Sequence, residues 1–187
     1  MEEALLRTHR SSQQDRIGLV QIFTGEGKGK TTAALGTVVR SLGHGLKVHI
    51  VFFMKGDYDY GERNFFSHLP NVTLQGFGSP HFMDPSNIQP DDYEQAELAL
   101  KASREVVLGG EYDLVVLDEV VLAAHWKLIG MDEVVKLIKD KPGNVEIILT
   151  GRYADTRLIE LADLVTECRS IKHPFTKGIS ARPGIEY

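Results

Sequence analysis

Three observations predict a doubly wound α/β fold. Apolar, β-branched runs of strand length recur along the chain and alternate with helical patterns. These runs are continuously apolar rather than alternating, which is typical of parallel strands covered on both faces. The first run leads directly into a turn rich in glycine and lysine, TGEGKGKTT at residues 24–32, and then into a helical pattern. We therefore expect a mainly parallel sheet flanked by helices on both faces.

Five segments are predicted as strands, and helical patterns lie between most of them. The strands are IGLVQIF (17–23), LKVHIVFF (46–53), NVTLQGF (71–77), YDLVVLD (112–118) and VEIILTG (145–151). The helices are TTAALGTVVRSL (31–42), DDYEQAELALKASREVVL (91–108), EVVLAAHWKLI (119–129) and MDEVVKLIKD (131–140). A short last strand is expected within LVTECRSI (164–171), and Trp126 is expected in the core.

The length and composition indicate one soluble domain. The 187 residues suffice for a single core, which we place at 17–187 behind a polar arm at 1–16. A net charge of -5 without runs of Lys or Arg argues against a nucleic-acid partner. The single Cys168 forms no internal disulfide and no zinc-ligand pattern. With neither a signal peptide nor a membrane-length apolar run, we expect a cytoplasmic protein that has no membrane partner.

The glycine-rich turn resembles a Walker-type phosphate loop. The second half of that motif, Gly-Lys-Thr, is present at residues 29–31, whereas its first position carries Thr24 in place of glycine. We expect Gly25 and Gly27 to supply the unusual backbone angles that a phosphate-binding nest requires. A glycine-rich turn with solvated lysines is the alternative interpretation, but the preceding strand and following helix favour the phosphate loop.

The chemistry of such a loop assigns a role to most of its residues. Backbone N–H groups and the positive end of the following helix attract an anion, and Lys30 adds a full charge. Thr31 would place its hydroxyl on a magnesium ion. The residues expected to contact ATP phosphates are Thr24, Gly25, Gly27, Lys28, Gly29, Lys30, Thr31 and Thr32.

Three further residues complete the expected site. Asp118 and Glu119 end an apolar strand, where a neighbouring carboxylate can complete a magnesium site. The alternative is an ordinary helix cap followed by an acidic first turn. Arg152 follows the strand VEIILTG, at the sheet edge where α/β folds bind ligands, and is expected to contact a phosphate or the ribose.

The order of motifs resembles the ATP:corrinoid adenosyltransferases of the cobalamin-synthesis type. The resemblance runs from about residue 17 to residue 187 and rests on these segments: TGEGKGKTTAALG, GERN (61–64), LDEV (117–120), LTGR (149–152), LADLVTE (161–167) and IKHPFTKGISARPGIEY. The combination of GKGKTT with KHPF and GIEY is the most specific part, because other P-loop classes lack that tail.

The resemblance implies a RecA-like P-loop fold and a specific reaction. Members of this family transfer the 5′-deoxyadenosyl group of ATP to the Co(I) of a reduced corrinoid and release inorganic triphosphate. The corrinoid would be cob(I)alamin or cob(I)yrinic acid a,c-diamide. The resemblance also implies Mg²⁺, with Mn²⁺ as an alternative ion, a homodimer, and a flavoprotein-type electron donor. Cob(I)alamin is itself a strong nucleophile, so no catalytic triad is needed.

The resemblance assigns residues to both substrates. Lys30, Thr31 and Glu119 are the implied catalytic residues, with Glu119 at the metal and Asp118 behind it. Lys28 is expected on an outer phosphate, although a solvated loop lysine remains an equal alternative. The corrinoid would contact residues of the 78–90 loop, which has no Trp here, and of the GERN segment: Phe82, His81, Glu62, Arg63 and Asn64. For these residues, packing and capping roles stay open.

Two other functions remain open at this point. A P-loop ATPase or nucleotide-dependent switch would need only the loop and the pair Asp118-Glu119, with Glu119 orienting a water. A nucleotide-binding subunit without the transfer chemistry is the other. The products distinguish the three: intact triphosphate, orthophosphate with ADP, or neither.

Overall fold

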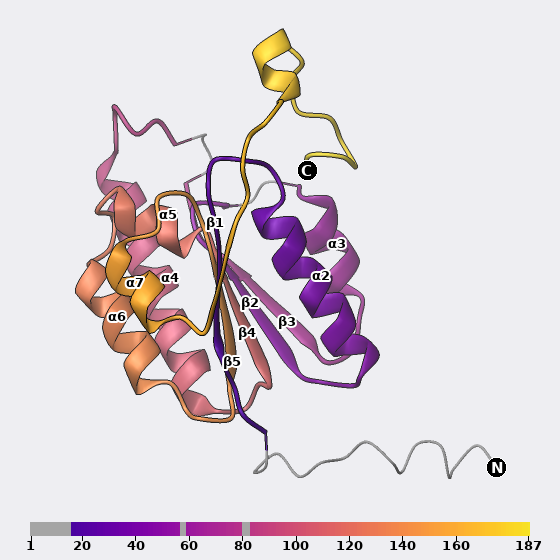
Figure 1. Cartoon of the computed structure of the whole chain (residues 1–187), viewed down its shortest axis with the longest axis vertical. Coiled ribbons are helices and arrows are strands. Elements are labelled where there is room, and N and C mark those ends of the chain that lie inside the picture. Colours follow the sequence, from indigo (N-terminus) through magenta and orange to yellow (C-terminus); the bar gives the residue numbers. More distant parts are fainter. Residues whose placement is uncertain (1–15, 57–58, 80–82) are drawn as a thin grey trace, which may run out of the picture.

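The sheet confirms the α/β prediction. The computed structural model describes residues 16–56, 59–79 and 83–187. Six strands, all paired in parallel, form one sheet in the order β3-β2-β4-β5-β1-β6 (Figure 1). The strands are β1 (Val20–Thr24), β2 (Val48–Phe52), β3 (Val72–Gly76), β4 (Leu114–Asp118), β5 (Glu146–Thr150) and β6 (Leu164–Glu167). Strand β5 lies between β1 and β4. Because the three strands are parallel, the loops that follow them meet at the carboxyl end of the sheet.

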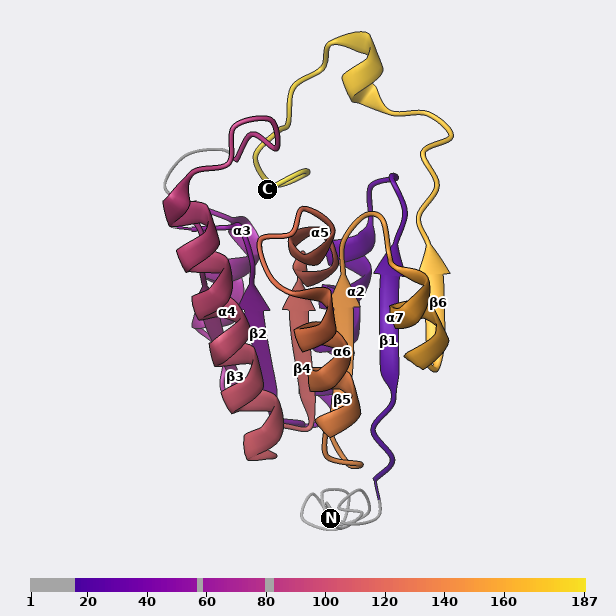
Figure 2. The same cartoon turned by 90° about the vertical axis from the view of Figure 1, so that its left-hand side faces the viewer.

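Helices cover both faces of this sheet. The helices are α2 (Lys30–Gly43), α3 (Gly61–Ser67), α4 (Pro90–Gly109), α5 (Val120–His125), α6 (Met131–Asp140) and α7 (Thr156–Leu161), with a short 3₁₀ turn η2 (Pro174–Lys177) in the tail. Helices α2 and α3 lie on one face, and α4 to α7 lie on the other (Figures 1 and 2). The fold is therefore an α/β sandwich of three layers.

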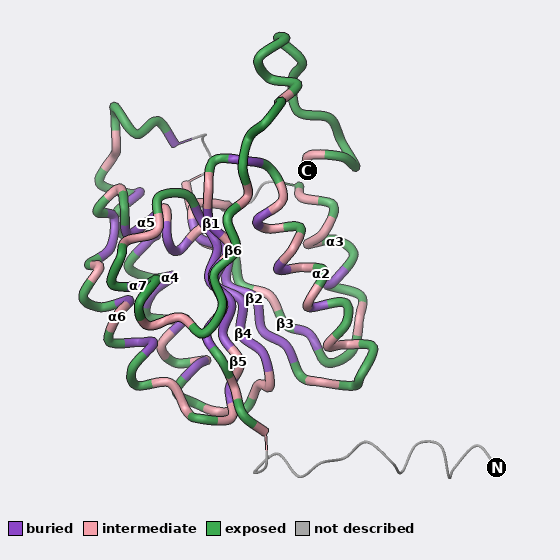
Figure 3. Tube along the Cα trace, in the orientation of Figure 1, coloured by how far each residue is buried: buried purple, intermediate pink, exposed green. Residues whose placement is uncertain are grey.

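Continuous apolar strands follow from this layering. In β5, Ile147 and Leu149 face the core under α4 to α7, whereas Ile148 faces the core under α2 and α3. In β4, Leu117 and Val116 divide in the same way. Because successive side chains alternate between two covered faces, the second to fourth positions of β4 and β5 are all buried and apolar (Figure 3).

The longest helix carries clear boundary signals. Pro90 occupies the first turn of α4, where its missing N–H is not needed. The Gln89 side chain and the Asp92 carboxylate cap each other's backbone N–H groups as a capping box. The helix ends before Gly110, whose φ of 66° is the left-handed conformation that favours glycine.

Three segments differ from the sequence prediction. The helix predicted over 119–129 is only Val120–His125, because Glu119 and Lys127 both adopt positive φ and interrupt the helix at either end. Helices α3 and α7 were not predicted, since seven and six residues carry too little periodicity. Trp126 is half-buried against the core below α4 to α7, as expected for a packing residue.

Strand β6 is the last strand at one side of the sheet. At one edge, β6 is exposed along its whole length. Arg16, the last residue of the expected arm, makes an ion pair with Asp113 at 2.9 Å, and residues 1–15 lie outside the described part of the chain. Within the described residues, none of the helices is long and apolar enough to cross a membrane.

His49 is a buried titratable residue that lies away from the loops at the carboxyl end of the sheet. His49 of β2 is only 4% exposed, and its imidazole contacts the Thr73 hydroxyl at 2.6 Å and the Gln75 side-chain oxygen at 3.2 Å. Burial lowers the pKa of this imidazole below its ordinary value of 6.5, and the hydrogen bond with Gln75 only partly opposes that effect.

This burial predicts a pH dependence of stability. Below pH 6.5 the unfolded chain binds a proton at His49 that the folded chain resists, so stability should fall as the pH falls from there. His49→Gln should lack this component, which amounts to at most about 1.4 kcal/mol per pH unit. Urea unfolding of both proteins at several pH values measures the difference. Parallel pH profiles for the two proteins would contradict the assignment.

Candidate active site

The turn between β1 and α2 has the geometry of a phosphate loop. Strand β1 ends at Thr24 and α2 begins at Lys30. None of the described side chains caps the start of α2, so its first N–H groups point toward the loop without such a partner. The buried hydroxyl of Thr24 accepts a hydrogen bond of 3.3 Å from the N–H of Ala154. Thr24 is thus an ordinary strand residue, and its position does not require the glycine of the strict motif.

The loop glycines serve two different purposes. Gly25 and Gly29 have φ of 95° and 121°, in the region that favours glycine. The expectation that Gly27 also has an unusual backbone angle was wrong, since its φ is not positive. Gly27 is needed because the tail approaches closely: a Cβ there would lie 2.7 Å from both the Cys168 oxygen and a backbone atom of Arg169.

Lys30 lies folded back over the loop. Its side chain is buried, and the ammonium donates a hydrogen bond of 2.8 Å to the Gly27 carbonyl. Burial lowers the pKa of this ammonium, and the nearby Glu119 carboxylate opposes that effect. An anion bound in the loop can replace the carbonyl as the partner of Lys30, because a charged acceptor forms the stronger hydrogen bond.

Next to the loop, Asp118 lies at the centre of a buried polar network. Its carboxylate is completely buried and accepts hydrogen bonds of 2.6 Å from both the Lys55 ammonium and the Thr150 hydroxyl. Burial alone would lower the pKa of Lys55, but the charge and hydrogen bond of Asp118 outweigh it and raise the pKa above its ordinary value. The network joins the carboxyl ends of β2, β4 and β5.

Glu119 follows in a strained conformation, and one of its carboxylate oxygens has no hydrogen-bond partner among the described residues. Its φ is 64°, and its N–H donates to the Thr150 hydroxyl at 2.9 Å. The carboxylate oxygen Oε2 is buried without a hydrogen-bond partner in the described part of the chain. Burial raises the pKa of this carboxyl, the Asp118 charge raises it further, and Lys55, Lys30 and Arg152 oppose the shift.

The donor set around Glu119 fits a magnesium ion held jointly with phosphates. A buried, unpartnered carboxylate oxygen is a strong acceptor for a cation. The described residues contain no group of three or more His, Cys, Asp and Glu that could hold a metal alone. Magnesium commonly binds one or two protein oxygens and takes its other ligands from water and substrate phosphates. Thr31, at the start of α2, and Glu119 offer oxygens of this kind.

Comparisons with known proteins identify the family. The family described as ATP:corrinoid adenosyltransferase BtuR/CobO/CobP matches residues 16–187. The chain belongs to this family of transferases. It is 38% identical to the corrinoid adenosyltransferase of Escherichia coli K12, over 93% of this chain and 88% of that protein. It is 34% identical to the corrinoid adenosyltransferase of Pseudomonas aeruginosa, over 100% and 92% of the two chains.

A third relative has similar coverage. The corrinoid adenosyltransferase CobA of Salmonella typhimurium is 35% identical, over 93% of this chain and 88% of that protein. The family assignment therefore covers both the phosphate loop and the tail.

The GERN segment forms the start of α3. The Arg63 guanidinium donates hydrogen bonds to the carbonyl oxygens of Lys55 (3.1 Å) and Gly56, and its Cζ lies 5.3 Å from the centre of the Phe52 ring. Arg63 thereby supports the loop that presents Lys55. Asn64 is exposed, whereas Glu62 lines a cavity beside the phosphate loop.

The expected corrinoid loop is described only in part. His81 and Phe82 lie outside the described residues. Before them, the Ser79 hydroxyl donates to Asp91 at 2.9 Å and to Asp92 at 2.7 Å, which ties the loop to the start of α4. The described end of the loop lies beyond the carboxyl ends of the strands, as does the tail (Figure 2).

The tail returns from η2 to the phosphate loop. The Lys28 ammonium donates to the Ile185 carbonyl and to the Glu186 carboxylate, both at 2.9 Å. A cavity of about 340 Å³ lies beneath the tail. It is lined by Thr31, Thr32 and Leu35 of α2, by Lys55, Tyr60, Gly61 and Glu62 on the way into α3, and by Gly184, Ile185, Glu186 and Tyr187 of the tail.

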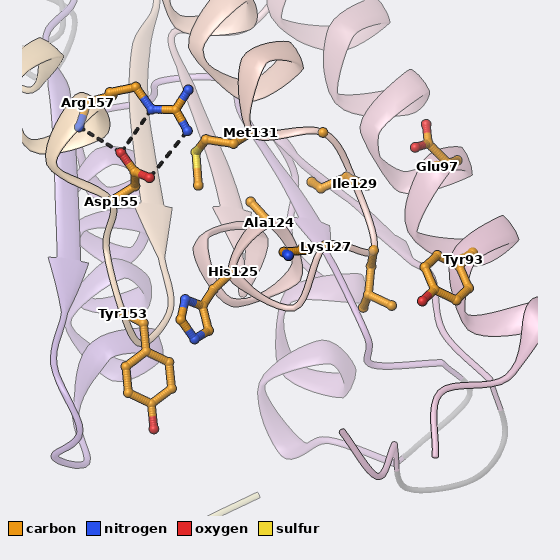
Figure 4. A pocket seen from close by; sticks show the side chains of 12 residues that line it. Tyr93, Glu97, Ala124, His125, Lys127, Ile129, Met131, Tyr153, Asp155 and Arg157 are labelled. Carbon is orange, nitrogen blue, oxygen red and sulfur yellow. Dashed lines mark hydrogen bonds and ion pairs between the residues drawn. The ribbon is translucent and has the colours of Figure 1, made fainter. Parts of the chain in front are cut away.

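A second cavity, of about 520 Å³, opens among the helices on the other face of the sheet (Figure 4). Its lining includes His125 and Tyr153, whose ring centres are 4.5 Å apart. The Arg157 guanidinium at its rim is paired with Asp155 and Asp132. None of the predicted site residues lines this cavity, whereas Thr31, Thr32 and Glu62 line the cavity beneath the tail.

Sequence reasoning missed Lys55, Thr150 and Glu186. Each contacts a residue that was predicted, Asp118 or Lys28, from a distant part of the chain. Lys55 and Thr150 stand at or just after the ends of β2 and β5. Their position at the carboxyl ends of parallel strands, where α/β folds bind ligands, could have identified these two residues in the sequence.

The Asp118 network predicts a large stability effect. Asp118→Asn should lower the free energy of unfolding by about 3–5 kcal/mol, because it leaves the buried Lys55 ammonium without a counter-charge. Adding Lys55→Met should recover part of the loss by removing the orphaned charge. Urea unfolding of the single and double variants measures both effects. A double variant no more stable than Asp118→Asn would show that the two charges are not coupled.

Proposed function

We propose that the protein transfers the 5′-deoxyadenosyl group of ATP to the Co(I) of a reduced corrinoid. In this reaction the cobalt electron pair forms a bond to the 5′ carbon. The carbon–oxygen bond to the phosphate breaks, and its electron pair leaves with inorganic triphosphate. The observation that carries the proposal is a complete phosphate loop beside the unpartnered Glu119, in a chain that belongs to the ATP:corrinoid adenosyltransferase family.

The phosphate loop then stabilises a leaving group. Negative charge accumulates on the triphosphate as the carbon–oxygen bond breaks, and the uncapped amides at the start of α2 together with the Lys30 ammonium would stabilise it. Mg²⁺, or Mn²⁺ in its place, would be held by Thr31 and Glu119 and would supply further positive charge to the phosphates. Arg152 adds a cation at the end of β5. Co(I) is the nucleophile, so these residues need not abstract a proton.

The proposal extends to substrates and partners beyond ATP. The acceptor would be cob(I)alamin or cob(I)yrinic acid a,c-diamide, bound near the 78–90 loop and the start of α3. Phe82 and His81 of that loop, with Glu62 and Asn64 of α3, are its proposed contacts, whereas Arg63 acts by supporting the loop before α3. A homodimer and a flavoprotein-type electron donor complete the proposal.

Hydrolysis of ATP is the second candidate function. A specific observation favours it: the raised pKa and unpartnered oxygen of Glu119 also suit a carboxylate that orients a water molecule. The family membership favours transfer over hydrolysis, because the matching relatives are named adenosyltransferases.

Product identity tests the proposal. Anaerobic incubation with ATP, Mg²⁺ and chemically reduced cob(I)alamin should yield light-sensitive adenosylcobalamin, followed by absorbance, together with an equal amount of inorganic triphosphate. Accumulation of orthophosphate and ADP without adenosylcobalamin would instead identify a hydrolase. Binding of ATP without either product would leave a nucleotide-binding protein.

Lys30 provides a test of leaving-group stabilisation. Lys30→Ala should raise the activation barrier by about 2–4 kcal/mol, because one electrostatic contact to the developing triphosphate charge is lost. Lys136→Ala, at an exposed lysine of α6, is the matched control and should transfer normally. The rate of adenosylcobalamin formation at saturating ATP measures the effect. A near-normal rate of transfer by Lys30→Ala would contradict the role proposed for this residue.

A further inference from the structure

The cavity beneath the tail depends on the position of the last residues. One wall consists of the start of α2 and another of the segment leading into α3, while residues 184–187 close the remaining side. In Figure 1 the tail leaves the end of β6, passes through η2 and turns back toward the ends of α2 and α3. Displacement of residues 184–187 would therefore open this cavity to solvent.

Lys28 of the phosphate loop forms hydrogen bonds with the tail. Its ammonium contacts a backbone carbonyl, that of Ile185, as well as the Glu186 carboxylate. The Glu186 carboxylate also accepts hydrogen bonds from Arg182, from the backbone N–H at 2.8 Å and from the guanidinium at 3.0 and 3.1 Å. The hydrogen bond from Gly184 N–H to the Tyr187 carbonyl, at 2.7 Å, closes the turn. The tail end is thus an internally bonded turn that presents two acceptors to Lys28.

The lining of the cavity suits a nucleoside. Leu35 and Ile185 supply apolar surface and Tyr60 an aromatic ring, while Thr32 and Glu62 supply hydrogen-bonding groups. A volume of about 340 Å³ lies within the range of small-molecule pockets, roughly 300–1,000 Å³. The cavity also adjoins Thr31, so a ligand could fill it and reach the phosphate loop together.

We propose that residues 184–187 form one wall of the nucleoside pocket, and that the Lys28–Glu186 ion pair is the clasp that holds this wall against the phosphate loop. Lys28 is then a positioning residue that acts on the tail, rather than a ligand of an outer phosphate. The carbonyl of Ile185 supports this assignment, because Lys28 binds the turn as a whole and not the carboxylate alone. The inference rests on the proposed use of ATP.

Binding of two ligands distinguishes the two roles considered for Lys28, that of holding the tail and that of contacting a phosphate. Calorimetric titration of the full chain with Mg-ATP reports the triphosphate and nucleoside sites together, and titration with inorganic triphosphate and Mg²⁺ reports the phosphate loop alone. Glu186→Gln keeps the shape of the side chain and removes its charge. Glu105→Gln removes the same charge from an exposed position on α4 and is the matched control.

The clasp predicts a selective effect. Glu186→Gln should weaken ATP binding about threefold to tenfold, the effect of losing a partly exposed charge-assisted contact, and leave triphosphate binding unchanged. Glu105→Gln should change neither affinity. Tighter triphosphate binding by Glu186→Gln would show that Glu186 competes with phosphates for Lys28, and would overturn the proposal. Equal weakening of both ligands, or no change in either, would also overturn it.

A second measurement uses the unaltered protein. Hydrogen exchange of the backbone amides at 182–187 should slow when ATP is added and remain unchanged when inorganic triphosphate is added. Equal protection by both ligands would contradict a nucleoside-specific wall. Neither readout depends on transfer, so selective effects on ATP in a protein that makes no adenosylcobalamin would support the wall and refute the proposed reaction. Absence of ATP binding to the unaltered protein would refute both.

Discussion

The rest of the site depends on the interactions of one buried carboxylate, that of Asp118. It lies at the end of β4 and binds Lys55, just after β2, and Thr150, at the end of β5. A fully buried carboxylate is stable only when its charge is compensated, so these strand ends are fixed relative to one another. The Thr150 hydroxyl donates to Asp118 and accepts from the Glu119 N–H, which fixes the backbone of Glu119 in its left-handed conformation. The hydrogen bonds from Asp118 through Thr150 thereby position Glu119, the residue proposed to bind the metal.

The same network explains why Glu119 remains available. Lys55 is paired with Asp118, and Lys30 donates to the Gly27 carbonyl, so neither of these cations is a hydrogen-bond partner of the Glu119 oxygen Oε2. The Asp118 charge next to it makes ionisation of Glu119 less favourable still. A bound divalent cation would reverse this penalty, because it stabilises the charged carboxylate. The proposed metal and triphosphate would therefore supply the charges that balance Glu119 and Lys30.

Local signals in the sequence were sufficient for the fold and for part of the site. Continuous apolar strands, the Gly-Lys-Thr turn and the acidic end of β4 gave the parallel sheet and placed Lys30 and Glu119 at one edge. Lys55 was not found, because its role exists only once β2 and β4 are neighbours. The need for glycine at position 27 was explained wrongly for a similar reason. The backbone that approaches Gly27 lies over 140 residues further along the chain, so the sequence does not show that contact.

The phosphate loop is contacted on two sides by the last part of the chain. The N–H of Gly27 donates to the Cys168 carbonyl just after β6, and the Lys28 ammonium binds the turn at Ile185. The first contact is a backbone hydrogen bond beside the sheet. The second is made by an exposed lysine, and exposed ion pairs contribute little to stability. A ligand that fills the cavity between α2 and this turn would favour the closed tail, because it contacts the tail only when the tail is closed.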